Sequence, residues 1–285
     1  MPWRVPDRVN SPNRWSRWRA ALTVAGLCGL PLLLGGCFKL RTTLTLMPDR
    51  SGKMEITIGS PLFALAEDEA GAGEGAGDPG GLDLEKLKTG DLEGMPGLVA
   101  ATLPREVEID GMPCVVFTAY FEDIDQFRLG DGPAEEPQFV LRPHEKGHVL
   151  EINEGEEGAG MDSWKEMTPE EREQMKPMFL QMVKGLEVTQ AYHLPGPVLE
   201  AEGMATVEGR TTQSVFTDED MIKMLNGEAP AARAAPLAGK KRILFGPSQV
   251  TEAEQAAFRE ELAQAKAEWA KLRAAAKNPK PGESE

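Results

Sequence analysis

The sequence predicts an α+β protein, with an antiparallel or mixed β-sheet, packed helices and a C-terminal amphipathic helix. Several runs alternate apolar and polar residues with the two-residue period of a half-buried strand. Other segments combine helix-capping residues with apolar residues at helical spacing. Because 41% of the 285 residues are hydrophobic, the chain can bury a core, which excludes a wholly disordered protein.

The N-terminal segment has the three parts of a secretory signal. Five arginines precede an apolar run from Ala20 to Leu34, and Gly35 and Gly36 then lead to Cys37. The ending Leu-Gly-Gly-Cys resembles the bacterial lipobox, which implies cleavage before Cys37 and acylation of that residue, with palmitate among the candidate acyl groups. We therefore expect residues 1–36 to be a signal peptide and Cys37 to carry a lipid anchor.

An uncleaved membrane span is the alternative interpretation of the same segment. The run 20–38 has the length that a helix needs to cross a hydrocarbon layer of about 30 Å. Pro31, the interior glycines and the cysteine at the boundary argue against a span.

The net charge limits the kinds of partner that the protein can bind, and the cysteine content limits its disulfide bonding. Removal of residues 1–36 leaves 26 basic and 45 acidic residues, a net charge of −19, so nucleic acid is excluded as a partner. Anionic headgroups would repel such a body, and membrane attachment therefore depends on the acyl chains. Cys114 would remain as a single buried thiol, with no disulfide framework.

The first predicted elements of the mature chain are two strands that form a hairpin. Residues 39–47 and 53–58 alternate apolar with polar side chains, and the turn-forming segment 48–52 joins them. Residues 66–81 form an acidic, glycine-rich loop, and a short helix is expected at 82–87. Two more strands are expected at 107–109 and 113–121. The second of these is apolar on both faces, so we expect it to be a central strand of the sheet. Another hairpin is expected at 139–141 and 149–152.

The second half adds helices to the strands. After a second acidic loop at 154–163, Thr168, Pro169 and Glu171 form a capping box that opens a helix toward Gly185, with a bend expected at Pro177. Strands at 187–194, 198–202, 213–216 and 242–245, a short helix from 217 to 226 and a linker at 229–239 come next.

The C-terminal segment 247–278 is predicted to be a long helix. Thr251 and Glu254 open it, and its apolar residues follow a 4-3-4-3-4 spacing: Phe258, Leu262, Ala265, Trp269, Leu272 and Ala276. This seam either packs back on the body or docks a partner. The expected organisation is thus a signal peptide at 1–36, an α+β domain at 37–246, the helix at 247–278 and a disordered tail at 279–285.

Three short motifs resemble the LppM-type lipoprotein domain of bacterial envelopes. They are the run from Cys37 through 44–53, the segment Tyr120-Phe-Glu-Asp-Ile-Asp125, and Leu194-Pro-Gly-Pro-Val198 followed by Gly203 and a strand at 212–216. The resemblance covers residues 37–226. It implies an α+β domain tethered outside a bacterial membrane, with lipid or glycolipid recognition in some members, and it carries no catalytic residues.

The chain departs from this pattern at two places. Arg50 stands where a glycine is expected, and Val215-Phe216 replaces a tryptophan. Gly196 in the third motif predicts a rigid turn that uses positive φ. In lipoproteins of some double-membraned bacteria, an aspartate after the lipidated cysteine marks retention at the inner membrane. Phe38 stands at that position here, and the resemblance to those proteins therefore favours the outer membrane.

The sequence contains one motif that is typical of a class of enzymes. His144-Glu145-Lys-Gly-His148 spells H-E-x-x-H, which on a helix would aim both imidazoles at zinc, with Glu145 as the base of a peptidase. Pro143 and Gly147 disfavour a helix here, and strands flank the motif, so a polar hairpin tip is the competing interpretation.

The sequence therefore favours a non-catalytic envelope lipoprotein, with no cofactor. It would bind either an apolar or lipid ligand or an envelope protein, with zinc peptidase as the alternative function. The candidate ligand-binding stripe is Met175, Met178, Phe179 and Met182 on the predicted helix.

Overall fold

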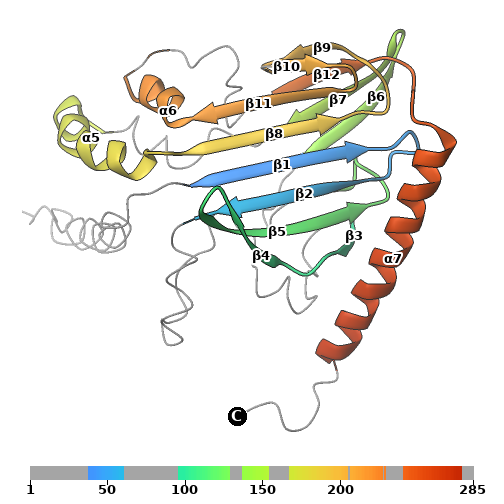
Figure 1. The fold of residues 1–285 in the computed structure, drawn as a ribbon. Coiled ribbons are helices and arrows are strands. Elements are labelled where there is room, and N and C mark those ends of the chain that lie inside the picture. Colours follow the sequence, from blue (N-terminus) through green and yellow to red (C-terminus); the bar gives the residue numbers. More distant parts are fainter. Residues whose placement is uncertain are drawn as a thin grey trace, which may run out of the picture.

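The computed structural model describes residues 38–60, 96–128, 137–153, 167–204, 206–226, 228 and 240–277. Within them the chain forms two β-sheets and three helices, the last one C-terminal, which confirms the α+β class (Figure 1). Several predicted features lie outside the described residues: the signal peptide, Cys37, the two acidic loops, the helix at 82–87, the linker at 229–239 and the disordered tail. None of the described helices combines the length and apolar character of a membrane span.

The large sheet is mixed. Its order is β10-β11-β8-β1-β2-β5-β3, with β4 also paired to β5. The strands are β1 (Lys39–Leu46), β2 (Gly52–Gly59), β3 (Leu98–Ala101), β4 (Arg105–Ile109), β5 (Met112–Phe121), β8 (Glu187–His193), β10 (Thr206–Glu208) and β11 (Thr211–Thr217). All pairs are antiparallel except β1 with β8, which are parallel.

The small sheet has the order β6-β7-β12-β9 and is antiparallel. Its strands are β6 (Phe139–His144), β7 (Gly147–Asn153), β9 (Val198–Glu202) and β12 (Lys240–Phe245). The alternating pattern explains how the two sheets meet, because successive side chains of a strand point to opposite faces. Leu44, Met54 and Phe121 leave the large sheet on the same side as one another and face the small sheet.

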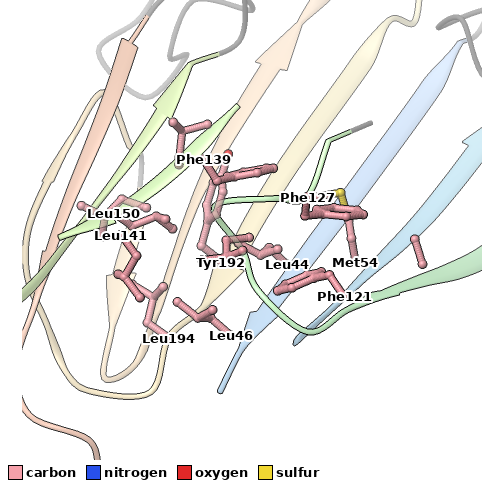
Figure 2. Close-up of a cluster of buried hydrophobic side chains, with 14 of the residues drawn as sticks. Leu44, Leu46, Met54, Phe121, Phe127, Phe139, Leu141, Leu150, Tyr192 and Leu194 are labelled. Carbon is pink, nitrogen blue, oxygen red and sulfur yellow. The ribbon is translucent and has the colours of Figure 1, made fainter. Parts of the chain in front are cut away.

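The main core fills the space between the sheets. Figure 2 shows Leu44, Leu46, Phe121 and Tyr192 from the large sheet meeting Leu150 and its neighbours from the small one. Phe127 lies in the connection between them and stacks on Phe121, with ring centroids 4.7 Å apart. Full burial of such side chains contributes about 1.5–3 kcal/mol each, so this layer is the main source of stability.

Two helices lie at one end of the large sheet, and the third begins at the other (Figure 1). Helix α5 (Pro169–Val183) starts at the predicted capping box and continues through Pro177, and α6 (Asp218–Leu225) follows β11. Helix α7 (Glu252–Lys277) packs on β3 and Tyr120, on the outer face of the large sheet. Its buried residues Phe258, Leu262, Ala265 and Trp269 are those of the predicted seam, so the helix packs back on the body.

The ends of the large sheet are named here by the ends of β1. At the Lys39 end, Lys39 pairs with Gly59 and with Glu187, and α5 and α6 lie nearby. At the Leu46 end lie the β1–β2 turn, the end of β8 and the start of α7.

The Pro-Gly-Pro turn belongs to the Leu46 end, and the structure corrects the reason for its glycine. Gly196 does not have a positive φ. A Cβ atom at that position would lie 2.0 Å from the carbonyl oxygen of Gly246, so glycine is needed because two backbones approach closely.

Candidate functional site

A groove at the Leu46 end lies between the first half of α7 and the outer face of the large sheet. It has a volume of about 440 Å³. We call it the α7 groove, and its lining residues are Thr45, Leu46, Met47, Lys53, His193, Leu194, Arg210, Thr211, Val250, Glu254, Ala257, Phe258 and Glu261. We call its apolar lining, which includes Phe258, the apolar wall, and its ion-paired lining the charged wall; α7 contributes to both.

The apolar wall includes Phe258, which is buried, and α7 is held against the sheet at several points. The Thr251 hydroxyl accepts from the Glu254 backbone at 3.2 Å, and Glu254 Oε2 accepts from the Thr251 backbone at 2.7 Å. This capping box fixes the first turn. Hydrogen bonds from Thr251 and the ion pair with Arg210 lower the pKa of Glu254 to about 2. The helix terminus that borders the groove is therefore an ordered wall.

The charged wall begins with a shared carboxylate on α7. Glu261 Oε1 accepts from Lys53 Nζ at 2.8 Å and from the Tyr120 hydroxyl at 2.9 Å. Burial raises the pKa of Tyr120, and its hydrogen bond to Glu261 raises it further. Tyr120 therefore acts as a neutral donor that helps Lys53 to hold Glu261 in place.

Arg210 lines the groove and carries an unpaired hydrogen-bond donor. Its Nη2 lies 2.9 Å from Glu254 Oε1, whereas its Nη1 is buried and has no hydrogen-bond partner within the part of the chain that the structure describes. Leaving a buried donor unpaired costs about 1–3 kcal/mol, more for a charged group. His193 lines the groove too, with Nδ1 2.9 Å from Thr211 Oγ1. Because Nη1 is buried, a ligand oxygen would satisfy this donor only once the guanidinium turns Nη1 toward the groove.

The H-E-x-x-H sequence does not have the geometry of a helical zinc motif. It forms the hairpin between β6 and β7, in which His144 pairs with Gly147 and His148 pairs with Pro143. Since directly opposed residues share a face and neighbours alternate, the two imidazoles project from opposite faces. His148 stacks on Phe245, and His144 Nδ1 accepts from the Lys146 backbone at 3.2 Å. Within the described residues no three His, Cys, Asp or Glu side chains gather in a metal-binding group.

The predicted methionine stripe lies at the Lys39 end, away from the groove. Met175, Met178 and Phe179 are half-buried on α5, which contacts α6. Met182 belongs to the same helix. The structure therefore separates this stripe from the groove by the length of the large sheet (Figure 1).

The three motifs that resemble the LppM-type domain gather around the Leu46 end. Arg50 of the first motif pairs with Asp123 of the second, Nε to Oδ1 at 3.1 Å, and with Asp125. Pro195 and Pro197 of the third accept backbone hydrogen bonds from Gln249 and Gly246. These motifs thus build the end of the molecule that holds the groove.

Sequence reasoning missed the residues that give the groove its polar character. Arg210 lies in the tight turn between β10 and β11, and no pattern in the sequence links it to Glu254. Lys53 and Glu261 are 208 positions apart and meet only because α7 folds back. His193 is exposed, and no sequence motif marks it as part of a groove.

No protein-family model matches this chain, and no curated protein sequence does. Among solved structures, the chain is similar to the NMR structure of the folded domain of Mycobacterium tuberculosis LppM. The similarity covers 77% of this chain and 94% of the other, at 13% sequence identity and a TM-score of 0.32.

Proposed function

We propose that this chain is a lipid-anchored bacterial lipoprotein with a non-catalytic domain, and that the domain binds an apolar ligand in the α7 groove. Cys37 would carry the anchor on the extracytoplasmic face, with the outer membrane preferred. The lipobox pattern supports the anchor, and the motifs quoted above support placement among LppM-type proteins. The observation that carries the binding role is the unpartnered Nη1 of Arg210 beside the apolar wall of the groove.

The groove defines the chemistry of its ligand. The charges of the groove lining do not attract a charged ligand, because Lys53 and Arg210 are each paired with a glutamate. The directional feature is a single donor, so the ligand must present an oxygen acceptor, such as a carboxyl, ester or phosphate oxygen. The accessible apolar lining, from Met47, Val250 and Ala257, favours an apolar portion next to that oxygen. Fatty-acyl lipids combine these two features.

Native mass spectrometry of the mature protein extracted from membranes tests both parts. We expect an acylated Cys37 at the N-terminus and an additional non-covalent mass of a lipid. Arg210→Ala should lose the non-covalent mass and keep the acyl chains. Arg242→Ala is the matched control, because Arg242 is similarly exposed and pairs with Glu202 on the small sheet. Wild-type protein without a bound lipid would refute the binding role, and an unmodified Cys37 would refute the anchor.

A protein partner is the other candidate that the sequence left open. A peptide segment with apolar side chains and a backbone carbonyl would satisfy the groove by the same chemistry. Cross-linking from a photoreactive residue at Ala257, which lines the groove, distinguishes the two ligands by the mass of the adduct. A protein-sized adduct abolished by Arg210→Ala would favour the partner.

A further inference from the structure

We propose that the Lys39 end of the large sheet rests against the bilayer through the β4–β5 hairpin, and that the α7 groove points away from the membrane. This inference rests on the proposed acylation of Cys37. It goes further because it assigns a membrane-contacting surface and the orientation of the domain.

The attachment of Phe38 to the fold fixes where the anchor must be. Phe38 packs against the main core, and its carbonyl accepts from the Glu187 backbone at 2.9 Å. One peptide bond separates Phe38 from Cys37, and consecutive Cα atoms lie about 3.8 Å apart. The acyl chains are thus attached directly beside the first residue of β1, without a linker that would let the domain turn.

The length of β1 then separates the groove from the bilayer. At about 3.3 Å per residue, the eight residues of β1 span about 26 Å. The groove lies at the other end of this strand, at Thr45, Leu46 and Met47. A domain held by the Lys39 end therefore presents the groove to the aqueous compartment.

The strand registers place the β4–β5 hairpin beside the anchor. Lys39 pairs with Gly59, and Gly59 pairs with Cys114 of β5. The hairpin extends beyond Cys114 to the pair Ile109 and Met112. Lys39 Nζ lies 3.8 Å from Asp110 at the hairpin turn, so the first residue of β1 and the tip of the hairpin are neighbours.

The hairpin is amphipathic, which is the property that an interfacial surface requires. Val107 and Ile109 lie on one face of β4 and are 39% and 36% exposed, although both are large and apolar. Met112 pairs with Ile109 and continues this face. Glu106 and Glu108 alternate with them on the other face, which would stay in water. Entry of the apolar face into the headgroup region would bury it and add to the anchor.

The experiment uses the mature protein purified from membranes and reconstituted in phosphatidylcholine vesicles. In a Cys114→Ala background, Ile109→Cys carries an environment-sensitive fluorophore, and the vesicles contain a lipid with a quencher near its headgroup. Leu199→Cys is the matched control, because Leu199 is also large, apolar and 47% exposed but lies on β9, just after the Pro-Gly-Pro turn. Val107→Cys is the second test position if Ile109→Cys does not fold.

The inference predicts strong quenching and a blue shift at position 109 or 107, and neither effect at 199. Vesicle flotation separates the two proposals. Protein that floats with the vesicles but is not quenched at the hairpin, or is quenched equally at 199, overturns the orientation and leaves the anchor standing. Protein that does not float overturns the acylation and the orientation together.

Discussion

The two ends of the large sheet differ in how they are held together. At the Leu46 end, α7 buries four side chains and is tied to the sheet by Glu254 and Glu261, and Arg259 reaches Asp49 at 3.4 Å. At the Lys39 end, α5 is half-buried, and every residue of β4 is exposed. The comparison shows that α7 is held by buried side chains and ion pairs at the groove end, whereas the other end leaves large apolar side chains exposed.

Phe258→Ala should have the largest effect and should act on the Leu46 end. Phe258 is 3% exposed, and truncation of a buried phenylalanine costs about 3–5 kcal/mol through lost burial and the remaining cavity. Hydrogen exchange of α7 and the denaturation midpoint measure the change. Met178→Ala on the half-buried α5 should cost less than about 1 kcal/mol. Equal losses for the two variants would contradict the difference between the ends.

Arg50 provides a smaller test within the same end. Its φ is 72°, in the left-handed region that favours glycine, and its ion pairs with Asp123 and Asp125 offset that strain. Arg50→Ala keeps the strain and loses the pairs, so we expect a loss of about 1–2 kcal/mol. Arg50→Gly relieves the strain and should be nearly neutral. Urea denaturation compares them, and a glycine variant as unstable as the alanine variant would show that strain is unimportant.

Local chemistry allowed much of the fold to be predicted, and the failures have physical causes. The predicted strand at 198–202 has the same bounds as β9, and the predicted capping boxes at Thr168 and Thr251 open α5 and α7. Strand β3 was missed because Leu98–Ala101 is a short apolar run without alternation, and β10 has only three residues. The parallel pairing of β1 with β8 joins segments far apart in the chain, which no local pattern encodes.

The candidate site was predicted much less well than the fold. The H-E-x-x-H letters sit on a hairpin, where the periodicity of a strand separates side chains that a helix would align. The predicted methionine stripe does lie on a helix, α5, but none of its residues lines the α7 groove. Arg210, Lys53 and Glu261 are brought together by tertiary packing alone, so only the structure identifies them.

Acidification should loosen the wall of the groove at α7. Because the pKa of Glu254 is lowered from 4.5 to about 2, the folded state binds fewer protons than the unfolded state in this range. The contribution of Glu254 is present above about pH 4.5 and is lost as the pH falls through about 2. Glu254→Gln should therefore lower the thermal midpoint near neutral pH and flatten its dependence on acid. Glu260→Gln on the same helix is the control and should follow wild type.

Asp110→Asn should have the smallest effect on stability. It tests the Lys39 end of the large sheet, where Asp110 lies at the tip of the β4–β5 hairpin. The Lys39–Asp110 pair is 3.8 Å long and Asp110 is 80% exposed, and exposed pairs contribute about 0–1 kcal/mol. Removing a carboxylate from the tip of the hairpin should instead strengthen its contact with anionic vesicles, because one source of repulsion disappears. The fluorophore at position 109 reports that change as deeper quenching at low salt. Unchanged quenching together with a large loss of stability would mean that the hairpin is a structural element, built like the groove end.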